Sequence, residues 1–462
     1  MLKRLTSNTQ SNILTRKVQR RNCHENKAPR HLPLVILLAL PITLHAQFTF
    51  TTNNGAITIA SYTGPGGAVV IPVETNGLPV TSIDIYAFQN RFNVTSVSIP
   101  EGVTNIGFGA FSSCSSLSSI TIPASVKAIR EQAFTSCSSL INVSIPSGVQ
   151  SLETAVFYGC ASLTSVSIPN SITNIGESAF SACTSLTSFS VPDAVKSIGD
   201  QAFGLCTSLT NVSIPSSVDR IAGSSFYACS SLQTFTVDPQ NPSYTSKDGI
   251  LFGKDLSLLV ACPAGKSGSY AIPEGVRNIG QFAFAVCRNL TNLFIPGTVT
   301  NLGFWSFSQC ENISRITIPR SVQYIDDFAF QDCTSLREVY FQGDAPAISG
   351  FGARIFLGDP VDLYYLPGTT GWGTFFSYLN LSGVLWNPTM QSNEESFGVR
   401  SNRFGFNIRG TINIPFMLEA TTNFSNSVWI PLQSGTLTNG SVDFIDPEFA
   451  NFPQRFYRIR SP

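Results

Sequence analysis

The chain has 462 residues with 28 basic and 28 acidic side chains, so its formal net charge is zero and only 12% of it is charged. The balance hides a segregation, because residues 1–31 hold eight Lys or Arg and one Glu, which leaves 20 basic and 27 acidic residues, a net of −7, in the remainder. This weakly acidic remainder excludes an electrostatic footprint for nucleic acid or anionic lipid.

The first 46 residues combine a basic stretch with an apolar run from Leu32 to Ala46. The run is shorter than the roughly 20 residues that a transmembrane helix needs, and it ends in a small residue. We therefore predict a signal peptide over 1–46 that is cleaved near Ala46, and export to the cell surface or the medium. A membrane anchor is the alternative. No Cys follows the run directly, which argues against a lipid anchor.

Residues 47–98 are expected to form an N-terminal cap and a first, longer coil. An alternating run from Ala56 to Ala60 and a second apolar run from Ala68 to Ile71 flank a Gly- and Pro-rich turn. This pattern predicts a hairpin-like cap that shields the apolar core of the first coil.

From Ile99 the chain repeats with a period of 23 residues. An Ile-Pro or Val-Pro step recurs at Ile99, Ile122, Ile145, Ile168, Val191 and Ile214, and again at Ile272, Ile295 and Ile318. A fixed period of this size is typical of a solenoid, in which each coil is too short to bury its own apolar face and packs on the next. We assign the solenoid to 99–342.

Two columns of the repeat are predicted to form ladders inside the solenoid, because only positions that face a shared core keep one residue type through every coil. The first holds Phe111, Phe134, Phe157, Phe180, Phe203 and Phe226. The second holds nine cysteines, Cys114, Cys137, Cys160, Cys183, Cys206, Cys229, Cys287, Cys310 and Cys333. We interpret these as small buried thiols. Rungs about 4.8 Å apart leave disulfides open, whereas thiols in single file without a CxxC pair argue against a metal site.

Each repeat also contains a strand pattern, seen in Leu140-x-x-Val143-x-Ile145, where buried positions alternate with polar ones. Stacked in register, these strands are expected to make one long parallel sheet on the concave face, and the following proline ends each strand. The segment from Ile175 to Cys183 predicts a turn and a short helical or 3₁₀ segment on the opposite side.

The period is interrupted once and then lost. Val237 and Ile272 are 35 residues apart, which is one repeat plus 12 residues, and Asp248-Gly249 between apolar neighbours predicts a projecting β-hairpin within 238–271. Residues 343–392 are predicted to be a degenerate last repeat and a cap. Short alternating segments separated by turn residues predict a small all-β module over 393–462.

The repeated pattern Ile-Pro-x-x-Val/Ile-x-x-Ile-Gly-x-x-Ala-Phe-x-x-Cys-x-x-Leu is clearest from Ile168 to Leu186. It resembles the 23-residue leucine-rich repeat of BspA-like (Treponema-type) bacterial surface proteins, over about 57–367. The resemblance implies a leucine-rich-repeat solenoid and a non-enzymatic binding or adhesion role. No asparagine column follows the strand, since Gly148, Ser171 and Ala194 stand there, so the asparagine ladder of the common eukaryotic repeat is not expected.

Candidate catalytic groups are scarce. The three histidines, His24, His31 and His45, all precede residue 47, which argues against His-dependent nucleophilic catalysis and His-ligated metal sites in the mature chain. Adjacent carboxylates such as Asp326-Asp327 leave a two-carboxylate hydrolase formally open, although acidic pairs are ordinary in solvated turns. No catalytic residue, metal ligand or cofactor is predicted.

The outward positions of the predicted strands carry mostly Ser, Thr and Asn in the early coils. Near the C-terminal end the same face is predicted to present Phe294, Arg315, Arg337, Glu338 and Tyr340. Exposed aromatics beside arginine are typical of interface anchors, so we expect the ligand site there. The alternative is that Phe294 and Tyr340 pack under the end cap.

Together these features predict a monomeric, secreted or cell-surface protein that recognises an extracellular protein or glycan and binds no nucleic acid. Two alternatives remain open: a structural envelope protein without a specific ligand, and an enzyme whose activity lies in the C-terminal module.

Overall fold

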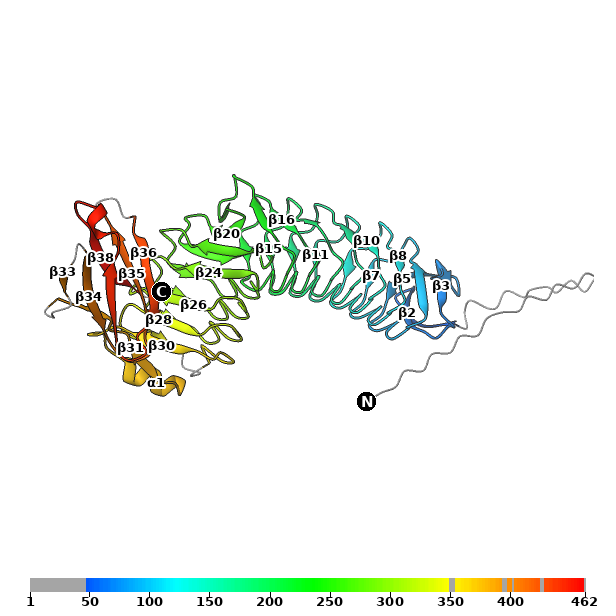
Figure 1. The fold of residues 1–462 in the computed structure, drawn as a ribbon. Coiled ribbons are helices and arrows are strands. Elements are labelled where there is room, and N and C mark those ends of the chain that lie inside the picture. Colours follow the sequence, from blue (N-terminus) through cyan, green and yellow to red (C-terminus); the bar gives the residue numbers. More distant parts are fainter. Residues whose placement is uncertain (1–46, 349–353, 393–396, 401–402, 424–427, 461–462) are drawn as a thin grey trace, which may run out of the picture. The chain divides into compact units, whose positions relative to one another are not determined.

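The computed structural model describes residues 47–348, 354–392, 397–400, 403–423 and 428–460, so the predicted signal peptide lies outside the described residues. The described residues all fall within one compact unit, which spans 44–462. It consists of stacked coils followed by a small β module (Figure 1). None of the helices in the described ranges is long and apolar enough to cross a bilayer. The predicted leucine-rich-repeat solenoid with parallel strands is confirmed.

The first described elements form a hairpin, β1 (Phe48–Asn53) and β2 (Ala56–Tyr62), whose strands pair antiparallel. Strand β2 also pairs parallel with β5 (Leu78–Ile83) and so joins the solenoid. The short strand β4 (Glu74–Thr75) pairs with β5. The rings of Phe48 and Tyr62 pack on Phe88, the first ring of the central stack, so the hairpin covers the apolar end of the first coil.

One strand of each coil lies on the same side of the solenoid, as predicted from Ile99 onward. These are β3 (Gly67–Val70), β6 (Val94–Ser98), β8 (Ser119–Thr121), β10 (Asn142–Ser144), β12 (Ser165–Ser167), β14 (Phe189–Ser190), β16 (Asn211–Ile214), β18 (Thr234–Val237), β22 (Gly268–Ala271), β24 (Leu290–Phe294), β26 (Arg315–Ile318), β28 (Glu338–Phe341), β30 (Asp362–Tyr365) and β31 (Gly383–Leu385). We call the side formed by their outward-pointing residues the strand face. The strand at 383–385 was not predicted. The predicted cap hairpin is wrong in one arm, because 56–62 pairs with 48–53, whereas 67–70 pairs parallel with the next coil. The prediction of one continuous sheet is wrong, because the pairing breaks into β3-β6-β8, β10-β12, β14-β16-β18, β22-β24 and β26-β28-β30-β31.

A second parallel ladder runs along another side of the coils and was not predicted. Its two-residue strands are β7 (Asn105–Ile106), β9 (Ala128–Ile129), β11 (Ser151–Leu152), β13 (Asn174–Ile175), β15 (Ser197–Ile198), β17 (Arg220–Ile221), β23 (Asn278–Ile279), β25 (Asn301–Leu302), β27 (Tyr324–Ile325) and β29 (Ala347–Ile348). In the strands of this ladder from β7 to β27 the second residue is Ile or Leu, and its side chain is buried in the core. The coils are therefore hydrogen-bonded to one another along two ladders.

The helical or 3₁₀ segment predicted between these ladders is wrong: the Ala-Phe part of each coil is a series of turns. In most coils two positions adopt left-handed backbone angles, as at Gln132 (φ 58°) and Ser136 (φ 59°), and such residues interrupt a right-handed helix. The turns bond to the next coil instead. The N–H of Phe111, for example, donates to the carbonyl of Ala133 at 2.8 Å.

The predicted Phe column forms two ring stacks in the core. Neighbouring rings lie nearly parallel at similar spacing, 5.4 Å from Phe111 to Phe134, 5.4 Å from Phe134 to Phe157 and 5.5 Å from Phe203 to Phe226. The stack stops at Phe226 and begins again at Phe284, then runs to Phe356. Offset stacking adds to the burial of each ring, so every coil is stabilised by its neighbours.

The insertion explains the gap in the stack. Strands β19 (Tyr244–Lys247) and β20 (Ile250–Gly253) form the hairpin that the Asp-Gly turn predicts, and β21 (Leu258–Ala261) pairs with β20 and then with β23. The hairpin does not simply project, because Ile250, Leu251 and Phe252 are fully buried. Leu251 belongs to the core of the preceding coils, while Ile250 and Phe252 belong to the core of the following ones. The insertion therefore joins two hydrophobic cores.

The C-terminal part contains α1 (Trp372–Leu379) and two small sheets. The first sheet comprises β32 (Thr389–Gln391), β33 (Gly398–Arg400), β34 (Arg403–Arg409) and β37 (Ser441–Asp446), and the second comprises β35 (Pro415–Thr421), β36 (Ile430–Thr436) and β38 (Phe456–Arg460), with a 3₁₀ turn at Phe449–Asn451. Buried Glu419 accepts hydrogen bonds from Arg458 at 2.8 Å and Arg460 at 2.7 Å. Burial alone would raise the pKa of Glu419, but the two guanidinium groups lower it.

Replacement of a ring in the stack should destabilise the solenoid far more than replacement of the adjacent aromatic. Phe157 is fully buried and Tyr158 is 41% exposed. We expect Phe157→Ala to lower the free energy of unfolding by about 3–5 kcal/mol, and Tyr158→Ala to change it by about 0.5 kcal/mol or less. Urea denaturation followed by circular dichroism measures both, and similar losses in the two variants would contradict the assignment.

Candidate ligand-binding surface

The strand face is polar and mostly uncharged in the early coils. The outward side chains at Ser165, Ser167, Ser188 and Ser190 are exposed, and the residues between them turn inward. A hydroxyl both donates and accepts hydrogen bonds, so this surface can match polar ligands without requiring charge.

The predicted cluster near the C-terminal end is only partly assembled on this face. Phe294 ends β24 and is 62% exposed. Arg315 and Glu338 face each other across β26 and β28, with Nε and Oε2 3.9 Å apart. Arg337 lies beside them but bends back to donate to the carbonyl oxygens of Thr334 and Leu336. Phe294 and Arg315 are thus the members available for a ligand.

The prediction that Tyr340 is an exposed anchor is wrong. Its side chain is 3% exposed, stacks on Tyr364 at 4.8 Å and meets the edge of Trp386. Its hydroxyl donates to Glu338 at 3.2 Å. Burial, aided by the Glu338 carboxylate, raises the pKa of Tyr340 and keeps this donor protonated. The alternative of packing under the C-terminal elements therefore holds for Tyr340 and not for Phe294.

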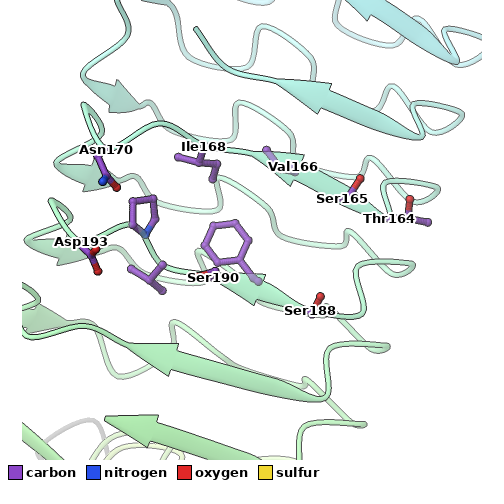
Figure 2. Close-up of a pocket in the computed structure, with 11 residues that line it drawn as sticks. Thr164, Ser165, Val166, Ile168, Asn170, Ser188, Ser190 and Asp193 are labelled. Carbon is purple, nitrogen blue, oxygen red and sulfur yellow. The ribbon is translucent and has the colours of Figure 1, made fainter. Parts of the chain in front are cut away.

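A groove of about 410 Å³ opens on the strand face between β12 and β14. Its polar lining consists of Thr164, Ser165, Asn170, Ser188, Ser190 and Asp193. Figure 2 shows Thr164, Ser165 and Ser188 toward one end of it, and Asn170 and Asp193 toward the other. Apolar side chains that include Val166 and Phe189 complete the lining.

The groove coincides with a break in the inter-coil hydrogen bonding. In the preceding pair of coils the N–H of Thr164 donates to Ile141 at 2.9 Å, and in the following pair the N–H of Thr210 donates to Thr187 at 3.1 Å. Among the described residues no such bond joins Thr187 to Thr164, and β12 and β14 do not pair. The walls of the groove therefore include strand edges without a partner strand.

The break is confined to the strand face. On the other ladder β13 and β15 pair normally, with Asn174 opposite Ser197, and the rings of Phe180 and Phe203 keep a spacing of 5.5 Å. Phe189 occupies an inward position that is Val in the adjacent coils. Ring size alone does not explain the break, however, because Phe235 takes the same position and its strand β18 still pairs with β16.

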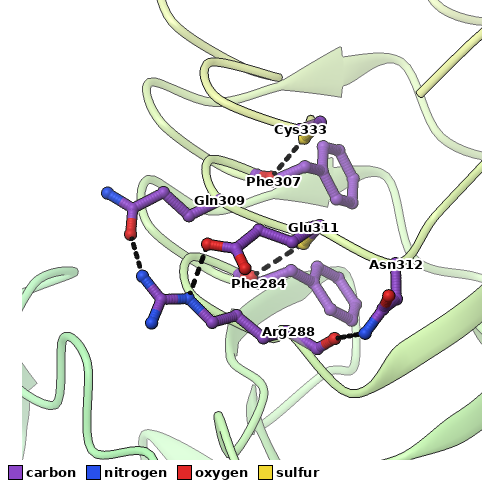
Figure 3. A network of polar contacts seen from close by, with 8 residues as sticks. Phe284, Arg288, Phe307, Gln309, Glu311, Asn312 and Cys333 are labelled. Carbon is purple, nitrogen blue, oxygen red and sulfur yellow. Dashed lines mark hydrogen bonds and ion pairs between the residues drawn. The ribbon is translucent and has the colours of Figure 1, made fainter. Parts of the chain in front are cut away.

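A separate group of polar contacts lies on the turns of the coils after the insertion. Figure 3 shows Arg288 bound to Glu311 at 2.9 Å and to Gln309 at 2.8 Å, while Asn312 donates to the Arg288 carbonyl at 2.7 Å. These contacts join consecutive coils, and the Glu311 carboxylate neutralises the charge of Arg288. We assign them a structural role.

The thiols of the cysteine ladder are buried and unreactive. Each thiol from Cys114 to Cys229 is close enough to donate to a Phe carbonyl of the preceding coil, as from Cys160 to Phe134 at 3.2 Å. Burial raises the thiol pKa values, to about 12 for Cys206, so these groups are protonated at neutral pH. Cys287 departs from the pattern: its thiol lies 3.8 Å from the Pro263 carbonyl, which Cys262 also approaches. In the described ranges no group of three or more His, Cys, Asp or Glu could hold a metal ion.

Sequence reasoning found the outward rows of the strand face and missed the groove. The six polar lining residues follow the repeat pattern, and the replacement of Val by Phe189 was the visible irregularity. The loss of backbone pairing between β12 and β14 changes no other residue type in the repeat, so the sequence did not reveal it.

The fold and this polar face define a leucine-rich-repeat protein of the kind found on bacterial surfaces. The family described as BspA type leucine rich repeat region, in six copies, matches residues 75–185, 151–249 and 265–362. The chain belongs to this family.

Solved structures support the same fold. A leucine rich cell surface protein from Faecalibacterium prausnitzii is 29% identical, with a TM-score of 0.58 over 73% of this chain and 97% of that one. The pneumococcal vaccine antigen PcpA is 21% identical, with a TM-score of 0.50 over 73% of this chain and 83% of that one, and it supports the fold alone. A comparison with curated proteins found no match.

The thiols should resist alkylation in the native protein. We expect iodoacetamide at pH 8 to leave the nine ladder cysteines unmodified, because burial raises their pKa values and keeps the thiols protonated, and to modify them all in guanidinium chloride. Mass spectrometry of the peptides measures each site. Rapid native labelling would contradict the buried ladder, and a mass two units lower for a peptide pair would reveal a disulfide.

Proposed function

We propose that the protein is an exported, surface-exposed binding or adhesion protein that contacts a protein or glycan through its strand face. The observation that carries this proposal is Phe294, an aromatic side chain 62% exposed on a face that carries mostly polar side chains. Exposed aromatics beside arginine are frequent interface anchors, and Arg315 begins the next strand along this face. The resemblance to a structure named as a cell surface protein supports the location.

The proposed role does not involve catalysis. Residues 47–462 contain no histidine, and burial raises the pKa of the ladder thiols, so they lack the thiolate that a nucleophile requires. Without an activated nucleophile or a general base of this kind, recognition by the surface is the function that the arrangement supports.

A structural envelope protein without a specific ligand is the second candidate, and the hydroxyl-rich strand face favours it. Ser and Thr also suit a solvated strand that contacts nothing. A ligand footprint that includes Phe294 distinguishes the two candidates, because a purely structural face has no need of an exposed ring.

The test compares the 44–462 unit with a Phe294→Ala/Arg315→Ala variant on arrays of extracellular-matrix proteins and glycans. We expect the variant to lose at least about tenfold in affinity for the ligand of the wild type, as removal of an interface anchor does. Ile141→Ala is the matched control, since Ile141 is 48% exposed but lies just before β10, far along the chain from the cluster.

Retained binding by the double variant would overturn the assignment of the site to Phe294 and Arg315. The absence of binding by folded wild-type protein to every array component would favour the structural role.

A further inference from the structure

We propose that the groove between β12 and β14 binds a neutral, hydroxyl-rich ligand, a segment of a glycan chain. The proposal rests on the binding function above. It adds a second ligand-binding site to the strand face, besides the one at Phe294 and Arg315. It is drawn from the lining of the groove, the unpaired strand edges beside it and the spacing of the coils beneath it.

The side chains of the groove match the hydrogen-bonding pattern of sugars. Thr164, Ser165, Ser188 and Ser190 supply hydroxyls, each of which donates once and accepts twice, and Asn170 supplies an amide with the same dual capacity. Sugar hydroxyls present donors and acceptors in alternation, so a lining of this kind can satisfy both. Ligands that offer only acceptors, such as phosphate groups, would leave part of the lining unmatched.

Charge in the groove also favours a neutral ligand. Asp193 supplies the carboxylate of the lining, and neither Lys nor Arg contributes to it. A carboxylate accepts hydrogen bonds from two neighbouring hydroxyls and repels anionic sugars. Sulfated, phosphorylated or sialylated chains are therefore disfavoured.

The backbone strengthens this match. The N–H of Thr187 and the carbonyl of Thr164 would be partners if the ladder were unbroken, as the equivalent bonds of the neighbouring coils show. Backbone polar groups without a partner are costly unless water or a ligand satisfies them. Thr164 lines the groove and Thr187 directly precedes the lining residue Ser188, so a hydroxyl group bound at this end of the groove can reach both.

An inserted peptide strand is the competing occupant, and the coil spacing argues against it. A strand added between β12 and β14 would require them to stand about 9.6 Å apart, twice the usual spacing. The same two coils remain paired at β13 and β15, and their Phe180 and Phe203 rings keep the 5.5 Å separation found elsewhere. The groove is thus a local opening too narrow at its base for a strand. Its volume of about 410 Å³ lies within the range of small-molecule sites.

The first experiment measures the backbone premise. In the free protein the amide of Thr187 should exchange with deuterium faster than the amides of Thr164 and Thr210, which both bond to the preceding coil. Equal protection of the three amides would show that the ladder is unbroken and would overturn the proposal.

The second experiment measures binding of the 44–462 unit to defined probes by calorimetry: tetrasaccharides of β-linked glucose, α-linked glucose and β-linked N-acetylglucosamine. The groove variant is Ser165→Ala/Ser188→Ala/Ser190→Ala. The matched control is Asn211→Ala/Ser213→Ala/Thr236→Ala, which removes equivalent outward groups from β16 and β18, where pairing is intact. Both variants should keep the unfolding midpoint of the wild type.

We expect at least one tetrasaccharide to bind, with the association constant reduced at least about tenfold in the groove variant and within about twofold of wild type in the control. Equal losses in both variants would overturn the groove in favour of the whole face. Binding retained by the groove variant would overturn it outright.

The two proposals fail in distinguishable ways. If no tetrasaccharide binds while an extracellular protein binds through Phe294, the proposed function stands and the glycan groove is overturned. If an extended peptide binds and protects Thr187 from exchange, the occupant is a strand and the spacing argument is wrong. If neither sugars nor proteins bind, both proposals fail.

Discussion

The structure depends on the exact repetition of one contact, the stacking of each Phe ring on the ring of the next coil. A coil of 23 residues buries little by itself, so the stack and the two ladders beside it make the stability of each coil a property of its neighbours. The thiol column suits this arrangement, because Cys160 is small enough for the corner and still offers a donor to the Phe134 carbonyl. Alanine would leave that carbonyl without its donor, and serine would bury a more strongly hydrated hydroxyl.

The insertion shows what happens where this contact is absent. Between Phe226 and Phe284 the ring stack is missing, and Ile250, Leu251 and Phe252 of the hairpin fill the space from both sides. Since nearest-neighbour contacts stabilise a solenoid, this junction divides it into two cores, which the hairpin bridges. The turns on either side also touch directly, where Ala228 packs with Ala285 and Val286. The hairpin is therefore part of the structural continuity of the chain, whatever its exposed residues contribute.

The repeat period predicted the fold because side-chain burial recurs with it, and the Phe and Cys columns are buried as that period implies. Prediction failed where the local structure depended on backbone angles or on residues from a later part of the chain. The left-handed angles at Ser136 and Ala182 occur in residues with no strong preference for them, so the turns resembled a helical segment. The two candidate aromatics illustrate the same limit. Phe294 and Tyr340 share an outward column, yet only Tyr340 is covered, by Tyr364 and Trp386 from later in the chain.

The interruptions of the strand ladder connect these findings with recognition. Where strands pair, their backbone groups are already bonded and only outward side chains remain, which on this face are mostly small hydroxyls. At two of the places where pairing stops, the face offers something more. Phe294 ends β24 and Arg315 begins β26, two strands that do not pair among those described, and the groove lies at the equivalent break between β12 and β14. On a solenoid whose repeats are otherwise alike, such breaks distinguish one coil from the next, and a ligand that recognises a particular place along the repeat requires that distinction.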